Sequence, residues 1–172
     1  MTNAACVVVL LLSVALLSAR RIDTAIRLGA TQALFAAVAS GEAATAVTVL
    51  VLSAGALPLA MARLDPAPDL TGRGHALLCC TAALAVLLAT IAVLGQVGPG
   101  EIVAIGASVT LLGLLLIALR AHTLAPALGL LSAQNGLVLV ASANVDLPLP
   151  ATLAVAVPLI PALMLADIWL RR

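Results

Sequence analysis

The feature that most constrains this chain is the length of its apolar stretches. Residues 102–119, IVAIGASVTLLGLLLIAL, contain no charged side chain, and as a helix they would extend roughly 27 Å, close to the roughly 30 Å of a bilayer's hydrocarbon core. Only 9% of all residues are charged and 64% are hydrophobic, with a mean hydropathy of +1.27. A soluble domain carries about 25% charged residues. The sequence therefore predicts an integral membrane protein, and the lack of apolar–polar alternation favours helices over barrel strands.

Charged residues and Gly/Pro breaks divide the chain into seven predicted membrane spans. The connections between them are short, and none has the composition of a linker. We therefore expect an all-α integral membrane protein, a bundle of about seven transmembrane helices forming one domain over residues 1–172. The predicted spans are 3–19, 25–40, 44–62, 76–95, 101–119, 123–142 and 151–169.

The basic residues predict the orientation of these spans. All of them are arginines, and in the seven-span arrangement every one falls on the same side of the membrane. By the positive-inside rule the N-terminus lies outside and the C-terminus in the cytoplasm. Arg20 and Arg21 follow the first apolar stretch instead of preceding it, which favours a retained first helix over a signal peptide. The arginines are Arg20, Arg21, Arg27, Arg63, Arg73, Arg120, Arg171 and Arg172.

Span 123–142 carries Gln134 and Asn135 side by side, followed by Gly136. Gln134 lies about 16 Å into the span, near the bilayer centre, where an unpaired amide costs several kcal/mol. Gln32 is a second amide at depth and a candidate partner. The amides either join helices, at about 0.6 kcal/mol per hydrogen bond, or form a polar node on an ion path. Gly136 would permit close approach of a neighbouring helix.

Ionisable side chains are absent from the centre of every predicted span. Proton relays and voltage sensors depend on such groups within the membrane, so the chain offers none of its own. Ser108 and Thr110 are expected to hydrogen-bond back to their own helix. Pro58, Pro158 and Pro161 are expected to kink the third and seventh spans.

The remaining side chains exclude several functional classes. The three cysteines, Cys6, Cys79 and Cys80, lie in apolar runs and are interpreted as small packing residues instead of a disulfide or metal site. We expect no catalytic residue, metal or cofactor, and the net charge of +1 argues against nucleic acid as a partner. With no tyrosine, one phenylalanine and one tryptophan, the chain lacks aromatic interface anchors, which favours a subunit surrounded by other membrane proteins.

Residues 111–136, LLGLLLIALRAHTLAPALGLLSAQNG, resemble the signature stretch of the E subunit of hydrogenase-4 (HyfE-like proteins). In that family an LLGLL-type helix leads through a short basic loop into a helix bearing Glu-Asn-Gly. RRIDTAIRLGATQALF, with Gln32, resembles the family's second span, and ALPLAMARLDP, with Pro58, the end of its third. The resemblance extends over essentially the whole chain, although only 111–136 is specific.

The resemblance implies a place in the membrane arm of energy-converting hydrogenase or formate hydrogenlyase-type complexes, which are related to complex I. The role would be similar to that of the small complex I subunit NuoK and the antiporter subunit MrpC, among large antiporter-like partners and without a cofactor. It also implies a multi-pass protein of the bacterial cytoplasmic (inner) membrane.

The sequence departs from the family pattern where titratable groups are expected. Gln134 replaces the glutamate before Asn-Gly, Ser53 stands where a lysine is expected, and the last span has no aspartate between Ala151 and Ala166. The resulting hypothesis is a non-catalytic subunit that scaffolds proton-translocating neighbours and is degenerate in its own proton path. The alternative is a small stand-alone transporter or exporter with its site at the proline kinks.

Overall fold

The computed structural model describes residues 2–19, 21–40, 81–86, 101–119 and 125–143, and these contain helices and no strand. Four long helices are present, α1 (Thr2–Ser18), α2 (Ile22–Ser40), α6 (Glu101–Leu119) and α7 (Ala125–Ala143), with a short helix at 81–86. The prediction of helices at 3–19, 25–40, 101–119 and 123–142 is confirmed to within three residues at every end. Predicted spans 44–62 and 151–169 lie outside the described residues, as does most of 76–95.

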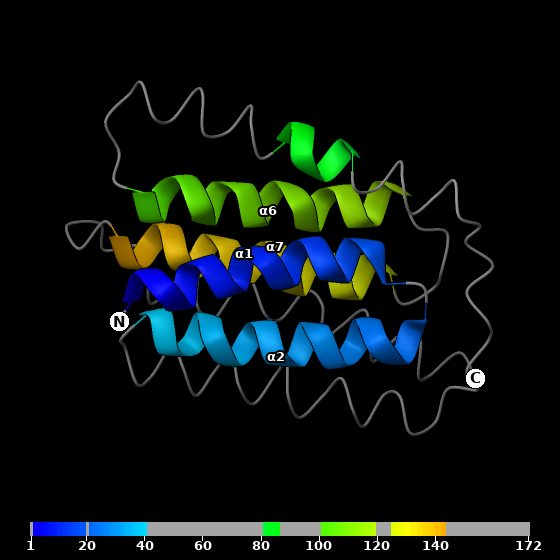
Figure 1. Ribbon diagram of the computed structural model, residues 1–172, viewed down its shortest axis with the longest axis horizontal. Helices are drawn as coiled ribbons and strands as arrows, with labels where there is room; N and C mark the ends of the chain where they lie inside the picture. The colour runs from blue at the N-terminus through cyan, green and yellow to red at the C-terminus, as the bar shows by residue number, and fades with distance from the viewer. Residues whose placement is uncertain (1, 20, 41–80, 87–100, 120–124, 144–172) are drawn as a thin grey trace.

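The four long helices form two antiparallel hairpins packed side by side (Figure 1). In the first hairpin α2 follows α1 after a short connection, and the N–H of Ala25 in the first turn of α2 donates to the carbonyl of Arg21 at 3.0 Å. The second hairpin joins α6 and α7. Colour order in Figure 1 shows that α1 and α6 run in one direction, and α2 and α7 in the other.

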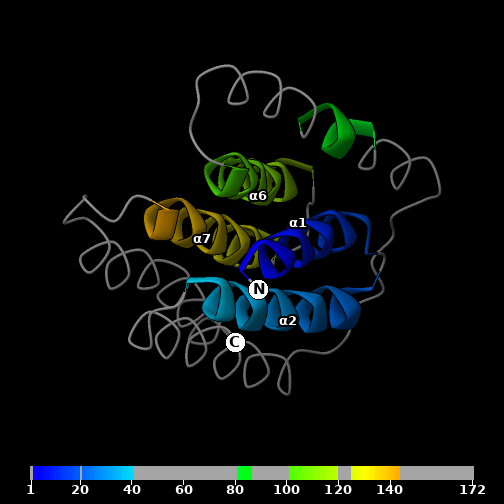
Figure 2. The same ribbon diagram turned by 60° about the vertical axis from the view of Figure 1, so that its left-hand side comes forward.

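Seen after rotation, the helices occupy the corners of a diamond, with α6 and α2 at opposite corners and α1 and α7 between them (Figure 2). Each helix packs against two neighbours around this ring, in the order α1, α2, α7, α6. A side chain that points inward from α2 can therefore reach both α1 and α7. This arrangement is what positions the polar site.

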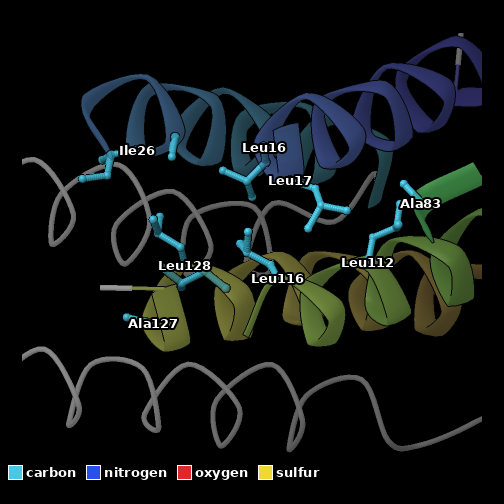
Figure 3. Close-up of a cluster of buried hydrophobic side chains, with 10 residues drawn as sticks. Leu16, Leu17, Ile26, Ala83, Leu112, Leu116, Ala127 and Leu128 are labelled. Carbon is cyan, nitrogen blue, oxygen red and sulfur yellow. The ribbon is translucent and has the colours of Figure 1, made fainter. Parts of the chain in front are cut away.

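Apolar side chains fill the interior of the bundle toward each of its two ends, above and below the middle of the helices. At one end Leu16 and Leu17 of α1 face Leu112 and Leu116 of α6, and Leu128 of α7 closes the cluster (Figure 3). The other end is built from smaller residues and Leu139. That second cluster contains Ala5, Cys6, Val9, Ala36, Ala39, Val109 and Leu139. Cys6 is buried and free, which confirms its interpretation as a packing residue, while Cys79 and Cys80 lie outside the described residues.

Glycines bring the backbones of α6 and α7 into direct contact. Gly106 faces Gly136 and Gly113 faces Gly129, so each helix presents two glycines seven residues apart. A Cβ on Gly113 would lie 2.5 Å from the amide nitrogen of Ala133 and 2.6 Å from the carbonyl oxygen of Gly129. A seven-residue spacing keeps small residues on one seam of a helix pair. The expectation that Gly136 permits a close helix neighbour is confirmed.

The outer faces of the helices expose apolar side chains. Leu11 of α1 and Val38 of α2 are 62% and 64% exposed, and each has a second exposed apolar residue one turn away. Helices α6 and α7 are long and apolar enough to cross a membrane, by length and composition. The exposed large apolar residues are Val7, Leu11, Leu34, Val38, Leu84, Leu111, Leu114 and Leu137.

Candidate functional site

A layer of polar side chains crosses the middle of the bundle. Gln32 and Thr110 lie near the midpoints of α2 and α6, Gln134 is the central residue of α7, and Ser13 lies in the C-terminal half of α1. Among the described residues the buried polar side chains are all uncharged, as the sequence predicts. The set consists of Ser13, Gln32, Ser108, Ser132, Gln134 and Asn135, each at most 2% exposed.

Gln32 links three helices. Its Nε2 donates to Ser13 Oγ on α1 at 2.7 Å and to Ser132 Oγ on α7 at 3.0 Å. Ser13 Oγ in turn donates to the carbonyl of Val9 at 2.8 Å. Because a hydroxyl has one hydrogen to give, Ser13 accepts from Gln32 while it donates to Val9, and in this arrangement the amide nitrogen of Gln32 faces both serine hydroxyls.

The hydroxyls of α6 bond to their own helix, as predicted. Ser108 Oγ donates to the carbonyl of Ala104 at 2.9 Å, and Thr110 Oγ1 to that of Gly106 at 2.9 Å. Thr110 Oγ1 also lies 3.3 Å from the carbonyl oxygen of Ala133. Thr110 therefore extends the polar layer into α7 across the glycine seam, the α6–α7 contact formed by Gly106, Gly113, Gly129 and Gly136.

Helix α7 is buried on every side at its centre, since residues 131–136 are all buried. One stripe, through Ala133 and Gly136, faces α6. A second stripe faces the inside of the diamond, because Ser132 bonds to Gln32 and Leu139 packs in the cluster with Val9 and Ala36. The second stripe is Leu128, Ser132, Asn135 and Leu139.

Gln134 lies on a third stripe of α7. Leu131, one turn before it, belongs to the apolar cluster at one end of the bundle, and Val138, one turn after it, packs against Ala33 of α2. Gln134 is thus enclosed between apolar neighbours along its own helix. Asn135, on the adjacent stripe, faces a different part of the interior.

Four buried side-chain atoms in the described part of the chain have no hydrogen-bond partner. They include the carbonyl oxygens of all three amides and one amide nitrogen. An unsatisfied buried polar atom costs about 1–3 kcal/mol, so each requires a physical explanation. The atoms are Gln32 Oε1, Gln134 Oε1, Gln134 Nε2 and Asn135 Oδ1.

The structure confirms that Gln32 and Gln134 are buried, but it does not pair them with each other. Gln32 pairs with Ser132, two residues before Gln134. The serines Ser13 and Ser132 were not predicted as site residues, because a single hydroxyl in an apolar run ordinarily bonds back to its own helix. Pro58, Pro158 and Pro161 lie outside the described residues.

The chemistry available to this layer is hydrogen bonding without proton exchange. Amides and hydroxyls neither titrate near neutral pH nor provide a nucleophile–base pair. No group of three or more His, Cys, Asp or Glu side chains that could hold a metal occurs within the described ranges.

Comparison of the chain with protein-family models, with curated proteins and with solved structures finds no match in any of the three.

Proposed function

We propose that this chain is a non-catalytic, integral membrane subunit of a complex I-like or energy-converting hydrogenase-like assembly, of the formate hydrogenlyase type. In this role it scaffolds antiporter-like subunits that translocate protons. Its own proton path is degenerate, because no side chain of the polar layer gains or loses a proton. The observation that carries the proposal is an interior layer that is polar but uncharged in every described helix it crosses.

Membrane insertion is supported by the outer surface of the bundle. Exposed leucine and valine side chains occur on all four long helices. Soluble monomers rarely expose contiguous apolar faces, whereas lipid or neighbouring subunits cover them in a membrane complex. The two hydrophobic helices of membrane-spanning length, α6 and α7, point to the same environment.

The relative directions of the four long helices are compatible with the proposed seven-span order, whereas the proposed orientation, with the N-terminus outside and the C-terminus cytoplasmic, rests on the arginines alone. In that order the first and fifth spans run inward, and the second and sixth run outward. The corresponding helices obey this rule, because α1 is parallel to α6 and α2 is parallel to α7 (Figure 1). The seven-span order places two membrane crossings, 44–62 and 76–95, between α2 and α6. With an odd number of crossings there, α6 and α7 would run in the opposite directions.

Loss of the proton path is supported by the identity of residue 134. The stretch 111–136 resembles the hydrogenase-4 E subunit signature, in which this position is glutamate. Glutamine has nearly the shape of protonated glutamate and keeps a donor and an acceptor, but it has no exchangeable acidic proton. Gln134 is 2% exposed, so its environment suits a neutral group.

The test is a pull-down of the tagged chain from native membranes in mild detergent, with mass spectrometry of the proteins that remain bound. We expect large antiporter-like membrane subunits together with a peripheral metalloprotein. If the chain emerges alone or as a homo-oligomer, the scaffold proposal fails and the stand-alone transporter becomes the better hypothesis.

A matched pair of variants at residue 134 sharpens the same experiment. When protonated, the glutamate of Gln134→Glu is neutral and still has a hydrogen-bond donor and an acceptor, so this variant should recover the same partner subunits. Gln134→Leu removes both the donor and the acceptor and should recover less of these subunits. Thr110→Val serves as the control, because it removes a hydroxyl that bonds mainly to its own helix. Equal recovery for all three variants would show that residue 134 has no part in assembly.

A further inference from the structure

The hydrogen-bond inventory of Gln32 leaves one defined acceptor unused. Both hydrogens of Nε2 are donated, one to Ser13 and one to Ser132. In this orientation Ser13 accepts from Nε2 and donates its own hydroxyl hydrogen to the carbonyl of Val9. Gln32 Oε1 is therefore held as a free acceptor in the interior, on a residue that is 0% exposed.

A second buried acceptor without a partner belongs to Asn135 on the neighbouring helix α7. Asn135 is one turn beyond Ser132 on the stripe of α7 that faces the inside of the diamond, and residues one turn apart have Cβ atoms about 5–6 Å apart. Asn135 is 1% exposed, and its Oδ1 has no partner. Among the buried side-chain atoms of the described residues, Gln134 Nε2 is the one donor without a partner, and Gln134 lies on the adjacent stripe.

We propose that Gln32 Oε1 and Asn135 Oδ1 bind water enclosed in the centre of the bundle. The ligand must donate to two acceptors and be small enough for a buried site. A water molecule has two hydrogens, and two bonds of about 2.8 Å bridge acceptors about 5 Å apart. Buried water commonly satisfies such otherwise unpaired groups.

The charge of the surroundings favours water over a monovalent cation. The acceptors are neutral carbonyl oxygens, and the buried polar side chains in the described helices include no carboxylate. Burying an unpaired charge costs far more than burying a neutral molecule that is hydrogen-bonded. This inference goes beyond the proposed function, because it concerns the interior of the chain and holds whichever assembly contains it.

The direct test is water-edited solid-state NMR of the full-length, isotopically labelled chain in lipid bilayers. Magnetisation that starts on water should reach the side-chain amides of Gln32 and Asn135 several-fold sooner than the methyl groups of Leu112 and Leu116 in the apolar cluster. Build-up at the two amides that is as slow as at these leucines would overturn the proposal.

Thermal unfolding of Asn135→Leu provides an independent measurement. If Asn135 Oδ1 binds water, leucine removes its hydrogen bond to that water and leaves Gln32 Oε1 as the one remaining acceptor. The unfolding midpoint then falls, and magnetisation transfer from water to Gln32 slows. If Asn135 Oδ1 is empty, leucine relieves a buried unsatisfied atom and the midpoint rises, which contradicts the proposal. Ser108→Ala is the control, since Ser108 bonds to its own helix and should leave the Gln32 signal unchanged.

Replacing sodium chloride with choline chloride distinguishes water from a bound cation. Water binding predicts no change in the amide signals of Gln32 and Asn135 or in the unfolding midpoint. A shift in these signals that returns on adding sodium would overturn the water assignment in favour of a cation site.

Discussion

Substitution of Gly113 by alanine should separate α6 from α7. The added Cβ would lie 2.5 Å from the amide nitrogen of Ala133, whereas ordinary contact begins at 3.4 Å. The shortfall is 0.9 Å, and the opposing atoms are backbone, which cannot rotate away as a side chain does. Such a separation would also lengthen the 3.3 Å contact between Thr110 Oγ1 and the carbonyl of Ala133 beyond hydrogen-bond distance.

The cost follows from two opposing effects. Overpacking a well-packed interface costs about 1–3 kcal/mol, while replacing glycine by alanine within a helix gains about 0.5–1 kcal/mol. We expect Gly113→Ala to be destabilising by about 1–2 kcal/mol, which in a chain of this size lowers the unfolding midpoint by about 2–8 °C.

Gly29→Ala is the matched control on α2. A Cβ there would meet Leu128 Cδ2 at 3.5 Å, an ordinary van der Waals contact. The propensity gain is then unopposed, and we expect this variant to be more stable than the wild type by about 0.5–1 kcal/mol. The assay is thermal unfolding of both purified variants in one detergent. The same direction of shift for both would refute the argument that backbone contact at Gly113 distinguishes them.

Three further substitutions test the polar layer and the outer surface. Gln32→Leu should destabilise the chain by about 1 kcal/mol in thermal unfolding, because it removes two interhelical hydrogen bonds; an unchanged midpoint would contradict this role. Thr110→Val should cost about 0.5 kcal/mol or less, since its link to α7 is a single long bond, and a loss as large as that of Gln32→Leu would be inconsistent. A spin label at Leu11→Cys, in a chain without its three native cysteines, should be accessible to oxygen and not to a water-soluble nickel chelate; access by the chelate would contradict the lipid-facing surface.

The sequence predicts the positions of the described helices well, because apolar runs between charges set where a helix can begin and end. Residues 101–119 are bounded by Glu101 and Arg120, and α6 has these limits. The depth of Gln32 and Gln134 also follows from their positions within apolar runs. Each is buried near the middle of its helix.

The partners of these amides could not be predicted, because they depend on which helices are neighbours. Gln32 and Ser132 are 100 residues apart in the sequence, and only the placement of α2 beside α7 brings them together. The facing glycine pairs of α6 and α7 could not be predicted for the same reason. The spacing of Gly106 and Gly113 is visible in the sequence, but the facing glycines on α7 are fixed by the hairpin's register.

The glycine seam also determines which motions the bundle can make. Side chains that interlock can change rotamer and let two helices slide, but the contact of α6 with α7 at Gly113 and Gly129 joins backbone to backbone. We therefore expect the α6–α7 hairpin to move as one body. Between the two hairpins, the long side chain of Gln32 donates to the hydroxyl of Ser132, a bond that can re-form after a small displacement. A change of shape in this bundle would be a rocking of α1–α2 against α6–α7, with Gln32 at the pivot.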